Sequence, residues 1–221
     1  MASAAPNDPL LSRRNPTPQM INGDVIAEPF APTLEVECTD FEQSRNRQMH
    51  VCKMHPAGKP GDNIRIKLPN CLIRFVPNPG EKPKLKLQLD RIAHQDLIKM
   101  LGSIDQQYRQ HIVDQQVFSG NEWRLYSSVI DSNPDKYQPL LSVTFHNYTT
   151  AYDKHTDPAG ITHYTTVNGD VRKYLYSGAT VGVLMQPRLV WKTGQSAGIQ
   201  WGIEQIVFMS EKGGGEVKCV F

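Results

Sequence analysis

The amino-acid sequence predicts a mainly β fold with one helical insertion, on the strength of three observations. Short segments that run apolar, or alternate between apolar and polar residues, recur between Gly and Pro turns about every ten residues. One longer segment instead repeats its apolar residues at steps of three and four, which is typical of an amphipathic helix. The 221 residues are 39% hydrophobic and 21% charged, which is enough to bury the core of one moderate-sized domain.

Three regions are expected along the chain. Residues 1–33 contain six prolines and few aromatic residues, and such a composition buries too little surface to offset the entropy lost on ordering. We therefore predict a mobile Pro-rich arm over residues 1–33 and a single β-rich domain over residues 34–210. A Gly-rich linker and C-terminal tail should follow over residues 211–221.

The expected elements can be placed in chain order. A helix is predicted over residues 90–116, with Gly102 as a candidate break. Strands are predicted over residues 34–38, 63–68, 71–76, 84–89, 122–130, 139–148, 161–167, 180–191 and 198–209. Many short strands around one helix favour a closed or half-closed antiparallel barrel over a parallel α/β sheet. Two architectures fit: an elaborated OB-type antiparallel barrel, and as the alternative a β-sandwich.

Composition excludes several classes of protein. The 24 Lys and Arg residues nearly balance the 22 Asp and Glu residues, so the net charge of +2 neither requires nor excludes a polyanionic partner. No apolar run approaches the roughly 18 residues of a membrane helix, and the first residues lack the apolar core of a secretory signal. We expect an intracellular protein without a membrane partner, whose four cysteines are reduced thiols.

The sequence offers no catalytic motif. It contains no Walker loop, no GxSxG elbow, no HExxH and no Rossmann glycine pattern, so we expect a protein that is not an enzyme. Two sets of metal-ligating side chains were weighed: His146, Asp153, His155, Asp157 and His163 in one segment, and Cys38, Cys52, His55 and Cys71 in another. The first set matches no known site geometry. In the second, Cys52 and His55 have the C-x2-H spacing of a pair of zinc ligands, but Cys38 and Cys71 lack such spacing. We therefore expect no cofactor, although zinc at the second set stays open.

Basic residues gather in and beside the predicted strands of residues 63–89. They are Arg65, Lys67, Arg74, Lys82, Lys84, Lys86 and Arg91. Lys82, Lys84 and Lys86 should share one strand face, since successive strand side chains point to opposite faces. Such a row could follow a phosphate backbone, but lysines on an edge strand also prevent aggregation.

In the second half, aromatic residues stand repeatedly beside cations. The residues are Trp123, Arg124 and Tyr126; Tyr148, Tyr152 and Lys154; Arg172, Lys173, Tyr174 and Tyr176; and Arg188, Trp191 and Lys192. Rings stack on unpaired bases while neighbouring cations meet phosphates, which is how single strands are held without sequence preference. Strand alternation over residues 171–177 would place Arg172, Tyr174 and Tyr176 on one face. Trp201 lies in a segment of which neither face is cleanly polar, so its strand should be central and Trp201 should belong to the core.

Residues 174–208 carry a resemblance to a known family. A Gly-introduced strand leads to Trp191, and after a turn comes G-I-x-W-x-x-x-Q with Gly198, Ile199, Trp201 and Gln205. This block, with the preceding helix and the NEWRLY segment, resembles OB-fold single-stranded-DNA-binding proteins of large eukaryotic DNA viruses and related elements. The resemblance covers about residues 90–208. It implies a replication-associated protein that coats single strands, although the apolar end VKCVF departs from the acidic tail of many such proteins.

Two hypotheses about function follow. In the first, the chain is a non-enzymatic single-stranded-DNA-binding protein of replication, recombination or repair that self-associates, located in the nucleus or at a viral replication site. The binding residues would be Trp123, Arg124, Tyr126, Arg172, Lys173, Tyr174, Tyr176, Arg188, Trp191, Lys192, Lys82, Lys84 and Lys86. RNA is left open as the bound strand, because the sequence does not encode contacts to the 2′-hydroxyl. In the second, it is a viral assembly protein with a β-sandwich core and an exchanging N-terminal arm.

Overall fold

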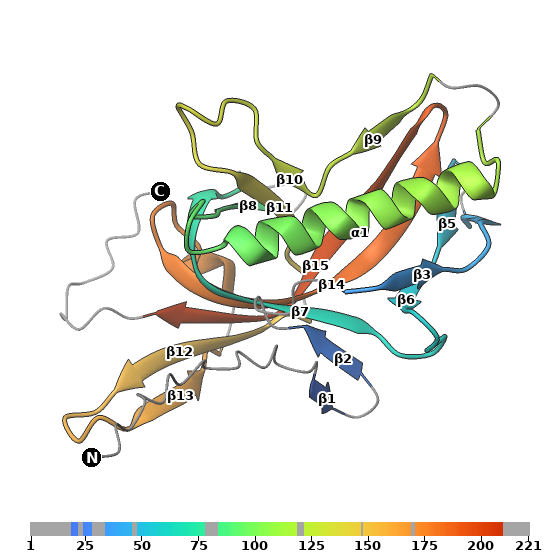
Figure 1. Cartoon of the computed structure of the whole chain (residues 1–221). Helices are drawn as coiled ribbons and strands as arrows, with labels where there is room; N and C mark the ends of the chain where they lie inside the picture. Colours follow the sequence, from blue (N-terminus) through green and yellow to red (C-terminus); the bar gives the residue numbers. More distant parts are fainter. Residues whose placement is uncertain are drawn as a thin grey trace, which may run out of the picture.

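Five strands close into a ring that forms the centre of the fold (Figure 1). The computed structural model describes residues 19–21, 24–27, 34–45, 48–77, 84–118, 122–146, 148–168 and 171–209. The ring strands are β7 (Ile64–Phe75), β8 (Lys84–Gln88), β11 (Leu140–Thr144), β15 (Ser196–Met209) and β14 (Thr180–Thr193). They follow one another in that order, and β14 pairs again with β7. Only the β11–β15 pair within the ring is parallel.

This ring confirms the prediction of a mainly β, OB-type barrel with one helix. A β-sandwich, the alternative, has two separate sheets, whereas here β14 bonds to both β15 and β7 and closes the circuit. Side chains that alternate along the ring strands point inward and supply most of the core. The barrel is elaborated by further strands that extend from both ends of β14 and β15.

One long strand, β7, stands where the sequence predicts two. Its inward residues are buried, and Asn70 in its middle has a positive φ of 50°. Asparagine tolerates this left-handed conformation better than most residues, so the chain continues through Pro69 and Asn70 instead of turning. The irregularity brings both Leu68 and Cys71 into the core.

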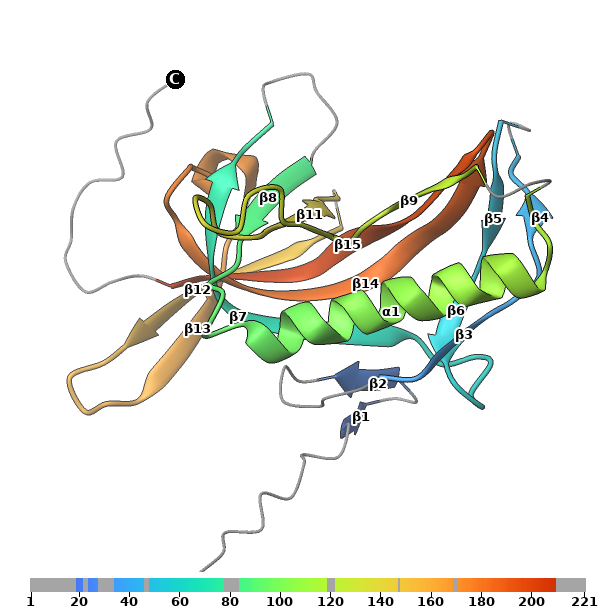
Figure 2. The ribbon, with the colours of Figure 1, turned by 45° about the horizontal axis from the view of Figure 1, so that its top comes forward.

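The helix α1 (Gln95–Asp114) is the predicted one, without the break at Gly102. Leu97, Leu101, Ile104 and Ile112 form part of its buried face. Gly102 lies on the exposed side, where the lack of a side chain removes no packing. Figures 1 and 2 both show α1 lying across β14 and β15. Among the described residues, no helix combines the length and the apolar composition that crossing a membrane requires.

Additional strands widen the sheet at one end of the β14–β15 hairpin. There β9 (Arg124–Tyr126) pairs with β15, while β5 (His50–Cys52) pairs with β14 and β4 (Glu42–Gln43) pairs with β5. Nearby, β3 (Val36–Cys38) and β6 (Met54–Pro56) form a separate two-stranded sheet. These strands turn the hairpin into a platform that projects from the barrel.

Further strands surround the barrel itself. The short β10 (Val129–Ile130) pairs with β11. The hairpin of β12 (Thr150–Thr156) and β13 (Thr162–Thr166) joins β15 through β12. The sequence suggests a polar loop where β12 lies. It forms a strand because its backbone hydrogen-bonds to β15 and β13, and its polar sequence alone does not indicate this pairing.

The segment predicted as an arm contains two strands. In it, β1 (Gln19–Ile21) pairs with β2 (Asp24–Ala27), and β2 pairs in parallel with β7 of the same chain. The exchanging-arm hypothesis instead places this segment on a neighbouring copy. The other residues of the arm, and residues 211–221, lie outside the described residues.

The strand expected over residues 171–177 is wrong. Val171–Tyr174 forms a 3₁₀ turn, η1, so the alternation that would place Arg172, Tyr174 and Tyr176 on one face does not exist. The backbone carbonyl of Arg172 accepts a hydrogen bond from the amide of Leu175, and Leu175 turns into the core. This local bonding competes with strand pairing for the same backbone groups.

Candidate nucleic-acid interface

One face of β15 carries glycine or an uncharged polar residue at alternate positions. These residues are Ser196, Gly198, Gln200 and Gly202, and they span about 20 Å at the rise of a strand. The opposite face holds Trp201, which is 1% exposed and pairs with the buried Val143 of β11. The core position predicted for Trp201 is therefore confirmed. The two glycines leave room for side chains of neighbouring strands to lie across β15.

At the hairpin end, rings cover Gly198. It pairs with Tyr126 of β9 on one side and with Trp191 of β14 on the other. A Cβ at Gly198 would lie 3.1 Å from Trp191 Cζ2, so the indole lies directly over this glycine. The centroids of the Tyr126 and Trp191 rings are 6.0 Å apart, and Arg124 Cζ lies 4.8 Å from the Tyr126 centroid. Tyr126 is 47% exposed.

At the barrel end, a cation covers Gly202. Arg188 stands at an irregularity in the β14–β15 register, and its Cγ is 2.1 Å from where a Cβ on Gly202 would be. Its guanidinium carbon lies 5.0 Å from the centroid of Tyr148, which in turn stacks on His146 at 4.9 Å. Tyr148 is 54% exposed. Arg188, His146 and Tyr148 thus form a second cluster of ring and charge on the same face.

The neighbouring barrel strands extend this face. Lys84 and Lys86 are the exposed residues of β8, and they pair with Thr144 and Ser142 of β11. Thr144 in turn pairs with Gly202, and its hydroxyl accepts a hydrogen bond from Gln200 Nε2 at 3.0 Å. The two lysines therefore point to the same side of the sheet as Arg188.

An exposed ring also accompanies Lys86. Its Nζ lies 5.6 Å from the ring centroid of Phe75 at the end of β7, and Phe75 is 53% exposed. We call the whole surface the β15 face. It comprises Phe75, Lys84, Lys86, Arg124, Tyr126, His146, Tyr148, Arg188, Trp191, Gly198, Gln200 and Gly202.

The electrostatics of the β15 face favour an anion. Glu204, the acidic residue of β15, is paired with Arg65, whose Nε lies 2.6 Å from a carboxylate oxygen of Glu204. Burial and then the charge of Arg188 lower the pKa of His146, so this ring is neutral near pH 7. Its Nε2 is buried and has no hydrogen-bond partner. Arg188 therefore carries the positive charge of its cluster.

Buried polar contacts fix the platform from behind. Trp201 Nε1 donates to Ser128 Oγ at 2.8 Å, and that hydroxyl donates to the Asp105 carboxylate of α1 at 2.7 Å. Tyr108 of α1 donates its hydroxyl hydrogen to the carbonyl of Trp191 at 2.9 Å. Since α1 is bonded to the backbone that carries the rings, the rings sit on a rigid support.

The structure separates Trp123 and Lys192 from the β15 face. Lys192 Nζ donates to the carbonyl of Val117, just past the end of α1, at 2.9 Å. The ring of Trp123 stacks on Phe118 at 5.2 Å and lies 5.0 Å below Arg109 of α1. Both residues therefore lie on the side of the sheet that α1 covers. Successive side chains of a strand point to opposite faces, so alternation alone places Lys192 on the other side of the sheet from Trp191.

The predicted residues of the 171–177 segment also lie elsewhere. Tyr174 and Tyr176 line a cavity of about 560 Å³ together with Phe208, whose ring centroid is 6.2 Å from that of Tyr174. Arg172 and Lys173 belong to the 3₁₀ turn beside it. Lys82 lies outside the described residues. Of the predicted binding residues, the β15 face gathers Lys84, Lys86, Arg124, Tyr126, Arg188 and Trp191.

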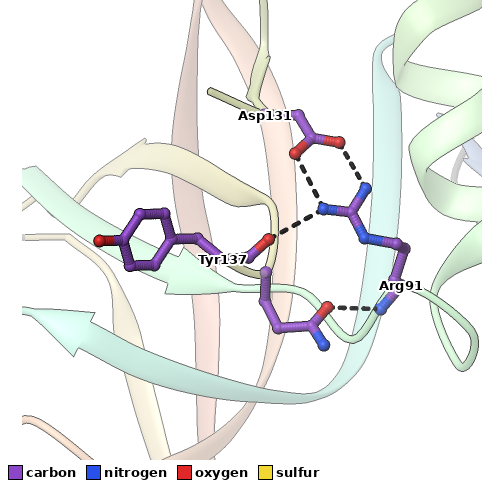
Figure 3. A network of polar contacts seen from close by, with 4 residues as sticks. Arg91, Asp131 and Tyr137 are labelled. Atoms are coloured by element: carbon purple, nitrogen blue, oxygen red, sulfur yellow. Dashed lines mark hydrogen bonds and ion pairs between the residues drawn. The ribbon is translucent and has the colours of Figure 1, made fainter. Parts of the chain in front are cut away.

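Two arginines among the basic residues of the first half are bound within the protein: Arg65 by Glu204, and Arg91 by Asp131. Figure 3 shows Arg91 with both terminal guanidinium nitrogens on the carboxylate of Asp131, at 2.5 and 2.9 Å. Arg91 also donates to the carbonyl of Tyr137, and its own amide donates to Gln138. The guanidinium holds the pKa of Asp131 below its usual value. Arg91 thus fastens the loop before β11 to the start of α1.

The other six residues of the β15 face were not among the predicted binding residues: Phe75, His146, Tyr148, Gly198, Gln200 and Gly202. The usable signal was the pair of glycines four residues apart in a strand, since glycine there indicates a close approach of other groups. What crosses Gly202 could not be read from the sequence, because Arg188 comes from β14 and His146 from the segment that follows β11.

Neither of the two candidate sets of metal ligands comes together as a whole. His163 Nε2 lies 3.0 Å from a carboxylate oxygen of Asp157, and the His163 ring stacks on that of His155 with their centroids 5.1 Å apart. His146 belongs to the β15 face instead. Cys71 lies near His94, with its Sγ 3.8 Å from Nε2. The first set therefore forms no common site with His146.

Comparisons with known proteins give likenesses in structure only. No family model matches the chain, and no curated protein matches it. A single-stranded-DNA-binding protein from bacteriophage Enc34 superimposes with a TM-score of 0.46 at 12% identity, covering 81% of this chain and 96% of that one.

Two further solved structures are similar to a comparable degree. The same phage protein in complex with ssDNA gives a TM-score of 0.43 at 13% identity, covering 82% and 98% of the two chains. The single-stranded-DNA-binding protein gp2.5 of bacteriophage T7 gives 0.38 at 14% identity, covering 69% and 90%.

Proposed function

We propose that the chain is a non-enzymatic protein that binds single-stranded DNA on the β15 face. The observation that carries the proposal is that three exposed rings on this one face each lie within reach of a cation: Tyr126 with Arg124, Tyr148 with Arg188, and Phe75 with Lys86. Unpaired bases stack on such rings or on the guanidinium planes, and the cations neutralise phosphates. In an OB-type barrel, the surface of the second and third strands is the usual oligonucleotide site. Here these strands are β8 and β11, and β11 lies between β8 and β15.

The single-stranded form is preferred because its bases are free to stack. In a duplex the base faces are covered by their neighbours, so the rings of the β15 face would meet only phosphates and groove edges. Duplex binding should then be weak and governed by the cations alone. RNA remains a second ligand to test, since no group here is known to read the 2′-hydroxyl.

The finer parts of the proposal concern the setting of this activity. We place the protein in replication, recombination or repair, with self-association along the strand, and in the nucleus or at a viral replication site. This setting rests on the resemblance of residues 174–208 to proteins of large eukaryotic DNA viruses. The similar solved structures come instead from bacteriophages.

Fluorescence anisotropy of a labelled dT oligonucleotide at two salt concentrations tests the proposal, with an equal-length duplex and an RNA oligonucleotide as competitors. We expect micromolar or tighter binding, a log–log salt slope of about −0.7 per phosphate contacted, and no displacement by the duplex. Arg188→Ala should weaken binding, whereas Lys99→Ala, which removes an exposed cation of α1, should not. Absence of binding at low salt, or equal effects of the two variants, would contradict the proposal.

A further inference from the structure

Three metal-ligating side chains from distant parts of the chain meet beside α1. They are Cys38 at the end of β3, Cys52 at the end of β5 and His111 in the last turn of α1. The two Sγ atoms and a ring nitrogen of His111 all lie within 4.8 Å of one another. Figures 1 and 2 show these three element ends next to each other. Among the described residues, no other group of His, Cys, Asp and Glu side chains gathers in this way.

Inside the protein, this cluster leaves a polar atom unsatisfied. His111 Nε2 is buried and makes no hydrogen bond. A buried nitrogen without a partner is destabilising, and a bound metal ion would satisfy it. The ring of Phe41, 5.8 Å from the His111 ring, restricts how the imidazole can turn. Cys52 is buried and Cys38 half-buried, and both are free thiols.

We propose that Cys38, Cys52 and His111 bind one Zn²⁺ ion, with water as the fourth ligand. Two thiolates and an imidazole are a donor set that zinc prefers in tetrahedral sites. At a Zn–S distance of about 2.3 Å, the ligand atoms of such a site lie about 3.8 Å apart, so the side chains need to close by about 1 Å at most. As each S–Zn bond forms, the thiol proton passes to solvent, and neither sulfur nor metal changes oxidation state.

The surroundings leave room for the fourth ligand. A cavity of about 380 Å³ opens beside the cluster and is lined by Cys38, His111, His55 and Asp114, among others. His55 was the expected partner of Cys52 in the sequence, but its Nδ1 lies 3.1 Å from the carbonyl of Pro56. The histidine of the site therefore comes from α1 rather than from the C-x2-H pattern.

A zinc ion here would be structural. It would join residues 38, 52 and 111, which lie on β3, β5 and α1. Cys52 pairs with Val190 of β14, next to Trp191, so the ion would lie behind the hairpin end of the β15 face. Because zinc binds the folded site and not the unfolded chain, it would stabilise this corner of the fold.

Metal content and a spectroscopic probe test the site in the full chain. Protein purified without chelator and kept reduced should contain about one equivalent of zinc, and removing it should lower the melting temperature by about 5 °C or more. Co²⁺ added to the metal-free wild type should give thiolate-to-cobalt charge-transfer absorption and intense tetrahedral d–d bands. Cys38→Ser, Cys52→Ser and His111→Gln should each lose this spectrum, while the controls His55→Gln and Cys71→Ala keep it.

The wild-type cobalt spectrum decides even if a variant fails to fold. Absence of zinc together with absence of charge-transfer absorption in the reduced wild type would overturn the proposal. A Cys38–Cys52 disulfide that, once reduced, takes up no metal would overturn it as well. A spectrum that survives His111→Gln would assign the metal to other ligands and refute the site as described. None of these readouts depends on DNA binding, so the zinc site and the proposed function can fail separately.

Discussion

Gly202→Ala places a methyl group where Arg188 crosses β15. The added Cβ would lie 2.1 Å from Arg188 Cγ, and a real Cβ essentially never approaches a neighbour within 3.0 Å. The Arg188 side chain must therefore move by about 1 Å or more. A rotation about χ1 supplies this movement, and it takes the guanidinium away from the ring of Tyr148. The backbone of Gly202 has an ordinary negative φ that alanine adopts, so the strand itself should persist.

The predicted cost to binding is that of one phosphate contact and its stacked ring. The log–log salt slope for single strands should become shallower by about 0.7, and Kd for a dT oligonucleotide should rise about five- to tenfold, or about 1 to 1.4 kcal/mol. Fluorescence anisotropy across a salt series gives both quantities. Thermal unfolding measured on the same samples should stay near the wild type, because Arg188 moves into solvent.

Gly102→Ala is the matched control. This glycine lies on the exposed side of α1 with no atom within 4 Å of an added Cβ. Replacing it should stabilise the helix by about 1 kcal/mol and leave binding unchanged. If Gly202→Ala left both Kd and salt slope at wild-type values, Arg188 would not contact DNA. If it lowered stability as much as binding, disruption of the barrel would explain the loss.

Three further predictions concern single residues. Trp191→Ala should weaken oligonucleotide binding by about 1–3 kcal/mol, whereas Trp123→Ala, on the side that α1 covers, should leave Kd within about twofold; equal losses would contradict the assigned face. The lowered pKa of His146 keeps its ring neutral near pH 7, so affinity should rise as pH falls below 6.5 and the ring gains charge beside Arg188; a His146→Gln variant that keeps the same pH dependence would refute this. Burial raises the pKa of Asp105 above 3.8, so the folded state binds this proton more tightly than the unfolded state. Its contribution is present below 3.8 and lost as pH rises through the raised value, and urea midpoints should show the wild type losing stability relative to Asp105→Asn as pH rises above 3.8.

The parts of the fold that follow a simple period could be predicted from the sequence. Apolar steps of three and four gave the helix, and alternation placed Lys84 and Lys86 together on the exposed side of β8. Trp201 was assigned to the core because neither face of its segment is cleanly polar, and the structure buries it. In each case the pattern within one element decides which way a side chain points.

Contacts between elements could not be predicted in the same way. The polar sequence of β12 resembles a loop, and only its neighbours β13 and β15 make it a strand. Trp123 and Trp191 both stand beside cations in the sequence, yet they lie on opposite sides of one sheet. Likewise Cys52 meets His111 rather than His55, because packing of α1 against the hairpin sets that contact and local spacing does not.

The two ends of the β15 face differ in what holds them. At the barrel end, Arg188 and Tyr148 lie over ring strands that are bonded on both sides. At the hairpin end, Trp191 lies on a projection whose support is β5 and the C-terminal half of α1, the elements that carry Cys52 and His111. If zinc ties those two elements together, its removal should weaken DNA binding mainly through Trp191. Chelation should then reduce the affinity of the wild type but change that of Trp191→Ala much less, since the contribution that zinc supports is already missing there.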